Sequence, residues 1–132
     1  MKTWVKRIVI GSISIVSIAL MSGYLFIYIA FSDMCRNDLA TESKSPDKKY
    51  KALIFQRDCG ATTGFSTQIS IIDANEELEN KGGNILTADG HPDKNNFKIS
   101  WVNSDVLLIK NTQGAKTIKK ESSLGRVNIR YE

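Results

Sequence analysis

The sequence predicts a mainly β protein, in which an N-terminal transmembrane helix is followed by a small antiparallel β-domain. Three observations lead to this fold class: a long uncharged run near the N-terminus, short segments in which apolar and polar residues alternate, and turn-forming residues between these segments. The 132 residues suffice for one domain with one appendage. We therefore expect a cytoplasmic stub and helix over residues 1–32, a linker over 33–49, and a meander or sandwich of about seven short strands over 50–132.

The uncharged run extends from Ile8 to Ser32 and consists mostly of bulky apolar residues. As a helix its 25 residues would be about 37 Å long, at roughly 1.5 Å per residue, which exceeds the bilayer core of about 30 Å. A helix of a soluble protein would show a polar face at helical spacing, and this run has only scattered serines. The sequence thus predicts one transmembrane helix over residues 8–32, with an aromatic belt at its outer end formed by Tyr24, Phe26, Tyr28 and Phe31.

Basic residues set the orientation expected for this helix. Lys2, Lys6 and Arg7 precede it, so the positive-inside rule keeps the N-terminus in the cytoplasm and places residues after about 33 outside. A cleaved signal peptide is the alternative, since residues 30–32 (Ala-Phe-Ser) loosely fit a cleavage site. We prefer an uncleaved anchor, because the apolar run exceeds the usual signal-peptide core of about 7–15 residues.

The net charge of +4 does not indicate a nucleic-acid partner. Three of the 18 basic residues lie before the apolar run, which leaves 15 basic residues against all 14 acidic residues in the exposed part, a net charge of +1. The alkaline character of the chain therefore comes from the inner flank of the helix, and we expect no nucleic-acid binding.

The cysteines are Cys35 and Cys59, both after the apolar run. Two thiols in one small exported domain are expected to pair as a disulfide, and Asp33 makes lipidation of Cys35 a poor alternative. In a thiol enzyme Cys59 would instead be a nucleophile, assisted by His91 or Asp58. Structural zinc is not expected, because paired Cys-x-x-Cys spacing is missing from the sequence, and no cofactor is predicted.

Residues 33–49 are polar and lack periodicity, which predicts a linker ending in a turn at residues 45–48 (Ser-Pro-Asp-Lys). Phe65 to Ile72 shows the clearest alternation of apolar and polar residues. Similar but shorter patterns predict the remaining strands, and close spacing favours antiparallel neighbours around a core between two sheet layers or inside a curled sheet. The expected strands cover residues 50–57, 65–72, 84–88, 97–101, 106–110, 115–120 and 126–131.

Two loops contain candidate site residues. The first is the predicted hairpin loop at 58–64, where glycines let the backbone approach a ligand and hydroxyls supply hydrogen bonds; its alternative is a disulfide-pinned turn whose hydroxyls cap their own backbone. The second loop could offer oxygen and nitrogen ligands to a divalent cation, although a Gly-Pro turn explains the same residues and we predict no metal site. The candidates are Asp58, Gly60, Thr62, Thr63, Gly64 and Ser66 in the first loop, and Asp89, His91 and Asp93 in the second.

Two segments resemble a family of small bacterial proteins: SPDKKYKA at residues 45–52 and FQRDCGATTGFSTQ at residues 55–68. The likeness continues at residues 83–85, at 88–90 and at Trp101, and so covers most of the exposed part. Members of this family are secreted or membrane-anchored and have no known activity. The resemblance implies a bacterial source and an exported β-domain, hence an anchor in the inner (cytoplasmic) membrane and a domain in the periplasm or outside. It implies no catalytic residue.

These observations favour a membrane-tethered interaction module over an enzyme. The expected partner, besides the membrane itself, is a protein or a cell-envelope component, and the module would be envelope-associated or toxin-neutralising. The alternative is an envelope hydrolase or thiol enzyme that uses Cys59.

Overall fold

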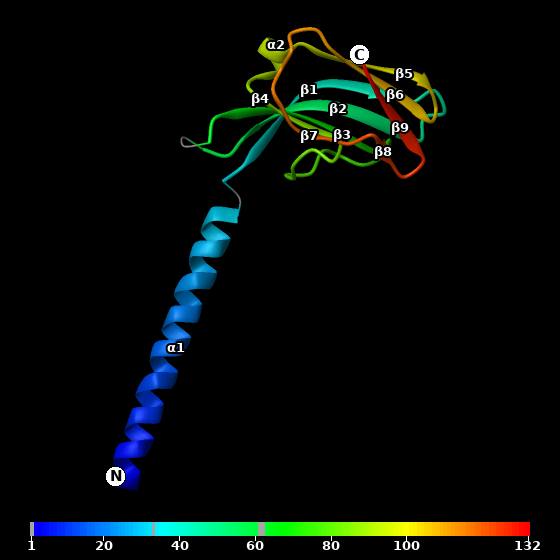
Figure 1. Ribbon diagram of the computed structural model, residues 1–132. Coiled ribbons are helices and arrows are strands. Elements are labelled where there is room, and N and C mark those ends of the chain that lie inside the picture. The colour runs from blue at the N-terminus through cyan, green and yellow to red at the C-terminus, as the bar shows by residue number, and fades with distance from the viewer. Residues whose placement is uncertain (1, 33, 61–62) are drawn as a thin grey trace. The chain divides into compact units, whose positions relative to one another are not determined.

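The computed structural model describes residues 2–32, 34–60 and 63–132. The chain divides into two compact units, Met1–Met34 and Cys35–Glu132 (Figure 1).

The first unit is a helix, α1 (Thr3–Ser32). Of the helices in the described part of the chain, it is the one long and apolar enough to cross a membrane, over Thr3–Phe31, and none of its apolar window is buried. Its serines do not weaken this property, because the hydroxyls of Ser12, Ser14 and Ser17 each donate to the carbonyl four residues earlier, at 2.9–3.0 Å. A membrane anchor and a signal sequence both fit these properties.

The second unit consists of two β-sheets and one short helix, α2 (Pro92–Asn95). The five-stranded sheet has the order β1-β2-β3-β4-β7 and is antiparallel throughout; the four-stranded sheet has the order β5-β6-β9-β8. The strands are β1 (Arg36–Lys44), β2 (Tyr50–Asp58), β3 (Phe65–Asp73), β4 (Leu86–Asp89), β5 (Phe97–Asn103), β6 (Val106–Asn111), β7 (Thr117–Lys120), β8 (Ser123–Leu124) and β9 (Val127–Tyr131).

The core lies between the two sheets, as expected for a sandwich. In the five-stranded sheet, Ile54 lies opposite Ile69, which lies opposite Leu86, so these three side chains share the inner face. They belong to one buried cluster with apolar residues of the other sheet, which confirms the predicted β-domain and its seven expected strands. The buried members of the cluster are Ala52, Ile54, Ile69, Ile71, Ile85, Leu86, Ala88, Phe97, Leu107, Ile109, Val127 and Ile129.

The predicted linker over 33–49 is wrong for residues 36–44, which form β1 and pair with β2 along their length. β1 is an edge strand and most of its residues are exposed, so burial does not impose apolar residues on it. A bulge between Leu39 and Thr41 also shifts the register, which interrupts any alternation of faces. The folded domain therefore begins at Cys35 rather than at Tyr50.

The four-stranded sheet departs from a simple antiparallel meander. β6 and β9 run parallel, because the chain leaves β6, adds β7 to the other sheet, and then returns. The two-residue strand β8 pairs with β9 and was not predicted, since two exposed residues are too few to show a period.

Side chains also link the two sheets. The indole Nε1 of Trp101, on β5, donates to the carbonyl oxygen of Ser43, on β1, at 3.0 Å. In the turn before β9, Arg126 reaches Asp47 in the β1–β2 turn (Nη2 to Oδ2, 3.6 Å) and Asp105 in the β5–β6 turn (Nε to Oδ1, 3.4 Å). These contacts hold neighbouring turns of the sandwich together.

Candidate functional site

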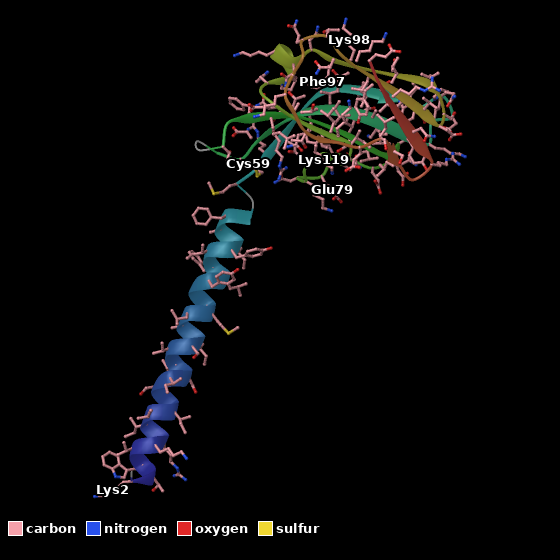
Figure 2. All side chains as sticks on the ribbon, in the orientation of Figure 1. Lys2, Cys59, Glu79, Phe97, Lys98 and Lys119 are labelled. Atoms are coloured by element: carbon pink, nitrogen blue, oxygen red, sulfur yellow. A yellow bond between two sulfur atoms is a disulfide. The ribbon has the colours of Figure 1, made fainter. Side chains whose placement is uncertain are left out.

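Cys35 and Cys59 lie at disulfide distance, with their Sγ atoms 1.99 Å apart, which confirms the predicted pairing. Arg36 lies opposite Asp58 in the β1–β2 ladder, so the register brings the two cysteines to the same end of these strands. Figure 2 labels Cys59, which follows β2 directly. The bond connects the first residue of the domain to the β2–β3 hairpin. It also leaves Cys59 without a free thiol, and a thiol is what a nucleophilic role requires.

The hairpin after β2 uses its polar groups on its own backbone. The amide of Gly60 donates to Oδ1 of Asp58 at 3.0 Å, and the hydroxyl of Thr63 donates to the carbonyl of Gly60 at 3.2 Å. Gly60 and Gly64 have positive φ values of 104° and 66°, which glycine adopts without strain. These contacts fit the alternative of a self-capped turn; Thr62 lies outside the described residues.

Ser66, the last residue proposed for this loop, belongs to β3 and to a side-chain network on that strand. Its hydroxyl donates to the carbonyl of Arg57 at 3.4 Å and accepts from Nε2 of Gln68 at 2.9 Å. Ser66 therefore helps to orient Gln68, which lies beneath the next loop along the chain.

The second candidate loop forms the start of α2. His91 is the N-cap, and its Nδ1 accepts the Asp93 amide at 3.3 Å. The imidazole also lies 3.3 Å from a carboxylate oxygen of Asp93 and packs edge-on against Phe65, with ring centroids 5.8 Å apart. Among the described residues, Asp89, His91 and Asp93 do not form a cluster able to hold a metal ion, nor do any other three potential ligands.

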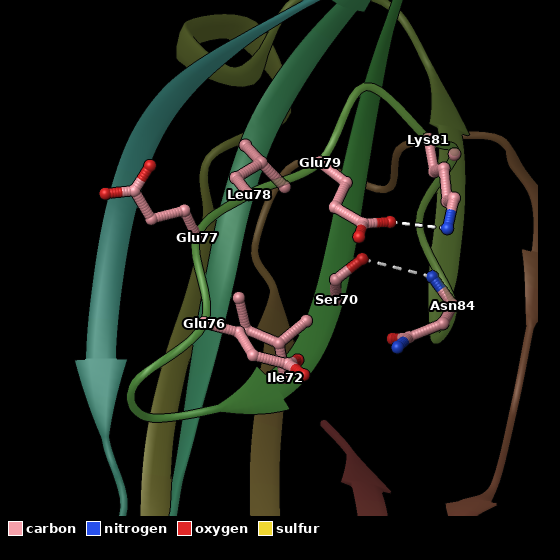
Figure 3. A pocket seen from close by; sticks show the side chains of 9 residues that line it. Ser70, Ile72, Glu76, Glu77, Leu78, Glu79, Lys81 and Asn84 are labelled. Atoms are coloured by element: carbon pink, nitrogen blue, oxygen red, sulfur yellow. Dashed lines mark hydrogen bonds and ion pairs between the residues drawn. The ribbon is translucent and has the colours of Figure 1, made fainter.

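The connection between β3 and β4, which contains none of the candidate residues above, borders a groove on the surface of the domain. Residues 74–85, called the strap below, connect β3 to β4 and lie over the outer face of the five-stranded sheet (Figure 3). On that face Leu53 and Phe55 are buried, with exposures of 1% and 0%, although they are not part of the core between the sheets. Compact connections of this length without regular structure are uncommon in small domains, and they often carry function.

The middle of the strap is fixed by side chains of β1 and β2. Nδ2 of Asn37 donates to the carbonyls of Glu79 (2.9 Å) and Lys81 (2.7 Å). Arg57 Nη1 donates to Oδ1 of Asn37 at 2.8 Å and to Oδ1 of Asn80 at 3.2 Å. The strap is thus held by groups 42 and 44 residues away in the chain.

The second half of the strap is fixed to β3. The amide of Gly83 donates to Oε1 of Gln68, and the amide of Asn84 donates to the hydroxyl of Ser70 at 3.1 Å. The Asn84 side chain then takes the place of a neighbouring strand, accepting from the amide of Ile71 at 2.9 Å and donating to its carbonyl at 2.8 Å. These bonds satisfy backbone groups of β3 that would otherwise need another partner.

Between the strap and β3 lies a groove of about 580 Å³ (Figure 3). A second hollow, of about 310 Å³, shares Ile72, Glu76 and Asn84 with it and continues toward the β8–β9 turn. We call the two together the strap groove. The first hollow is lined by Ser70, Ile72, Glu76, Glu77, Leu78, Glu79, Lys81, Gly82 and Asn84, and the second by Tyr50, Ile71, Ile72, Asp73, Glu76, Asn84, Leu124, Gly125 and Val127.

The strap groove is acidic at its rim. The carboxylate of Glu79 is paired with the ammonium group of Lys81, and this hydrogen bond raises the pKa of Lys81 above its ordinary value. Across the described part of the chain, Glu76 and Glu77 have no ion-pair partner, and both residues are exposed. The rim of the groove therefore has two exposed carboxylates without an ion-pair partner among the described residues, although the charge of Glu76 also helps to raise the pKa of Lys81.

The sequence alone does not predict a site at the strap. Its signals are local and weak: a run of acidic and amide residues that ends in the Gly82-Gly83 pair. The groups that fix it, Asn37, Arg57 and Gln68, lie on other strands, so only the tertiary structure brings them together.

Comparison with known proteins gives a family and no activity. Neither the curated proteins nor the solved structures include a significant match. A family match covers residues 2–122 and thus takes in both α1 and most of the β-domain. The chain belongs to a family of unknown function, DUF5412.

Proposed function

We propose that this protein is a membrane-tethered binding module, anchored by α1 in the bacterial cytoplasmic membrane, with its β-domain outside. The observation that carries the proposal is the nature of α1: an exposed apolar helix, uncharged from Ile8 to Ser32, that directly precedes a disulfide-bonded domain. Side chains such as Ile18, Leu20 and Met21 are 67%, 70% and 75% exposed, and lipid is the environment that accommodates such a surface.

Charge and redox chemistry support the proposed orientation. Lys2, Lys6 and Arg7 precede the uncharged part of α1, as in helices whose N-terminus stays in the cytoplasm. The Cys35–Cys59 bond lies on the other side of the helix and is typical of an oxidising compartment.

A binding role fits the β-domain better than catalysis. The polar groups of the β2–β3 hairpin cap its backbone, and the sulfur of Cys59 is already bonded. The strap groove, in contrast, has fixed walls and uncommitted polar groups at its rim, which is the arrangement expected of a ligand-binding surface.

The test is a topology measurement on the full chain in a bacterial host. Alkaline phosphatase fused to the C-terminus is active only outside the cytoplasm, so we expect high activity in a membrane fraction that resists alkaline extraction. The intact mass of the fusion should retain residues 1–32. A triple variant, Lys2→Glu, Lys6→Glu and Arg7→Glu, should lose most of this activity, because it removes the charges that orient the helix.

Two results would overturn the proposal. Activity confined to a soluble fraction, with residues 1–32 missing from the mass, would identify α1 as a cleaved signal peptide. Phosphatase inactivity in the wild-type fusion would place the domain in the cytoplasm.

A further inference from the structure

We propose that the strap groove binds an extended, basic segment of a partner protein, with lysine or arginine side chains lying along its floor. The inference rests on the proposed function as a binding module and names the chemistry of its partner.

The shape of the groove fits an extended chain. Its two hollows, of about 580 and 310 Å³, adjoin each other at Ile72, Glu76 and Asn84, which line both of them. A compact small molecule would fill one hollow, whereas a polypeptide segment can follow both.

The floor and the rim of the groove match the two halves of a basic side chain. Ile72, Leu78 and Leu124 supply apolar surface on which the methylene stem of lysine or arginine can lie. Glu76 and Glu77 supply carboxylates that have no ion-pair partner among the described residues. Figure 3 shows Glu76 beside Ile72 and the Glu77 side chain on the outer side of the strap, so a cationic head group in the groove would pair with Glu76, while Glu77 adds negative charge at the rim.

Charge is also segregated on this domain. Residues 73–81 contain four carboxylates and one lysine, a net charge of −3. The other residues after position 32 contain fourteen basic and ten acidic side chains, a net charge of +4. A basic partner should therefore be attracted more strongly to the strap than to the remainder of the domain taken as a whole.

The groove is formed before any partner arrives. Asn37, Arg57, Gln68 and Ser70 fix the strap backbone, and the Asn84 side chain bonds both backbone groups of Ile71. Pre-formed walls reduce the ordering cost of binding.

The experiment measures peptide binding to the full chain in lipid nanodiscs by fluorescence anisotropy. The probe is a fluorescein-labelled octapeptide of alternating lysine and leucine, compared with the same peptide carrying glutamate in place of lysine. We expect the lysine peptide alone to bind the wild type. The double variant Glu76→Gln/Glu77→Gln should bind it about 2- to 30-fold more weakly, since two exposed charge pairs together contribute about 0.4–2 kcal/mol.

A matched control removes two exposed carboxylates elsewhere, in the double variant Asp89→Asn/Asp93→Asn. It changes the net charge equally and should bind within about twofold of the wild type. Equal losses in both double variants, or no binding of the lysine peptide at millimolar concentration, would overturn the inference. Full competition by spermine at equal amine concentration would do the same, because it would show that a simple amine suffices. None of these readouts depends on membrane orientation, so they are distinguishable from failure of the topology test.

Discussion

Gly83 is a strap residue that lies very close to the backbone of β3 and β4. A Cβ atom at this position would lie 2.8 Å from the carbonyl oxygens of both Ile69 and Leu86. Those oxygens belong to the backbone of β3 and β4, so neither can move without disturbing the ladder. We therefore expect Gly83→Ala to lower the free energy of unfolding by about 3 kcal/mol, measured by urea denaturation of the detergent-solubilised chain.

The neighbouring glycine is the control for this effect. A Cβ atom at Gly82 would meet only the side-chain Oε1 of Gln68, at 3.3 Å, and that group can shift. Gly82→Ala should cost less than about 1 kcal/mol. Similar costs for the two substitutions would show that the close approach at Gly83 is not what fixes the strap.

Asp47 makes the stability of the β1–β2 turn depend on pH. The hydroxyl of Ser45 donates to its Oδ1 at 2.7 Å, and this bond is the main cause that lowers the pKa of Asp47; the amide of Lys49 and the charge of Arg126 add to it. Because folding lowers this pKa, the carboxylate of Asp47 stabilises the folded state. This stabilisation is fully present above the pKa of the unfolded chain, about 3.9, and is lost as the pH falls through the pKa of the folded protein.

The pH dependence that we assign to Asp47 can be tested by comparing the melting temperatures of the wild type and Asp47→Asn at several pH values. The wild type should be more stable at pH 7, and the difference should shrink toward pH 2.5, because protonation removes the same interaction as the substitution. Ser45→Ala should also weaken the pH dependence, as it removes the main cause of the shift. A difference that stays constant with pH would contradict the role given to the Asp47 carboxylate.

Among the elements, burial explains the clearest strand predictions and the two missed strands, whereas β7 was predicted although it is an exposed edge strand. The strand pattern was clear where alternate residues face the core, as in β3 and β9. β1 and β8 are edge strands whose residues are mostly exposed, so their sequences are not constrained to show a period. A strand is recognisable in a sequence when one of its faces is buried and therefore apolar. An exposed edge strand is held mainly by backbone hydrogen bonds, which any residue except proline can make.

β1 also contributes to the link between the sheets through Trp101. Replacement of this residue by phenylalanine removes the indole donor to the Ser43 carbonyl and some packing volume, with little change in apolar character. We expect Trp101→Phe to lower the free energy of unfolding by about 1–2 kcal/mol, measured by circular dichroism during denaturation. Val102→Ala on the same strand is the control and should have little effect, because Val102 is 54% exposed. Equal effects would mean that the indole bond does not hold the sheets together.

For the whole molecule, the division into an apolar helix and a β-domain was predictable, because composition alone separates the two parts. The cysteine pairing was predictable for a similar reason, since both thiols lie in one small domain. The strap groove was not predictable: Asn37 and Glu79 are 42 residues apart, and their contact depends on the register of three strands. The β2–β3 hairpin has the more distinctive sequence, yet its described polar groups cap its own backbone. The strap has the less distinctive sequence, yet it borders the groove.

The disulfide bond should determine how stable the β-domain is without affecting attachment to the membrane. Cys35 and Cys59 are 24 residues apart. Closing a loop of that length lowers the entropy of the unfolded chain and thereby raises the free energy of unfolding by about 3 kcal/mol. The double variant Cys35→Ser/Cys59→Ser should therefore unfold at a lower urea concentration, and wild-type protein with its disulfide reduced should match it. Both should remain in the alkali-resistant membrane fraction, because α1 is a separate unit. A double variant as stable as the oxidised wild type would show that the bond adds nothing to the fold, whereas its release from the membrane would show that attachment depends on the β-domain.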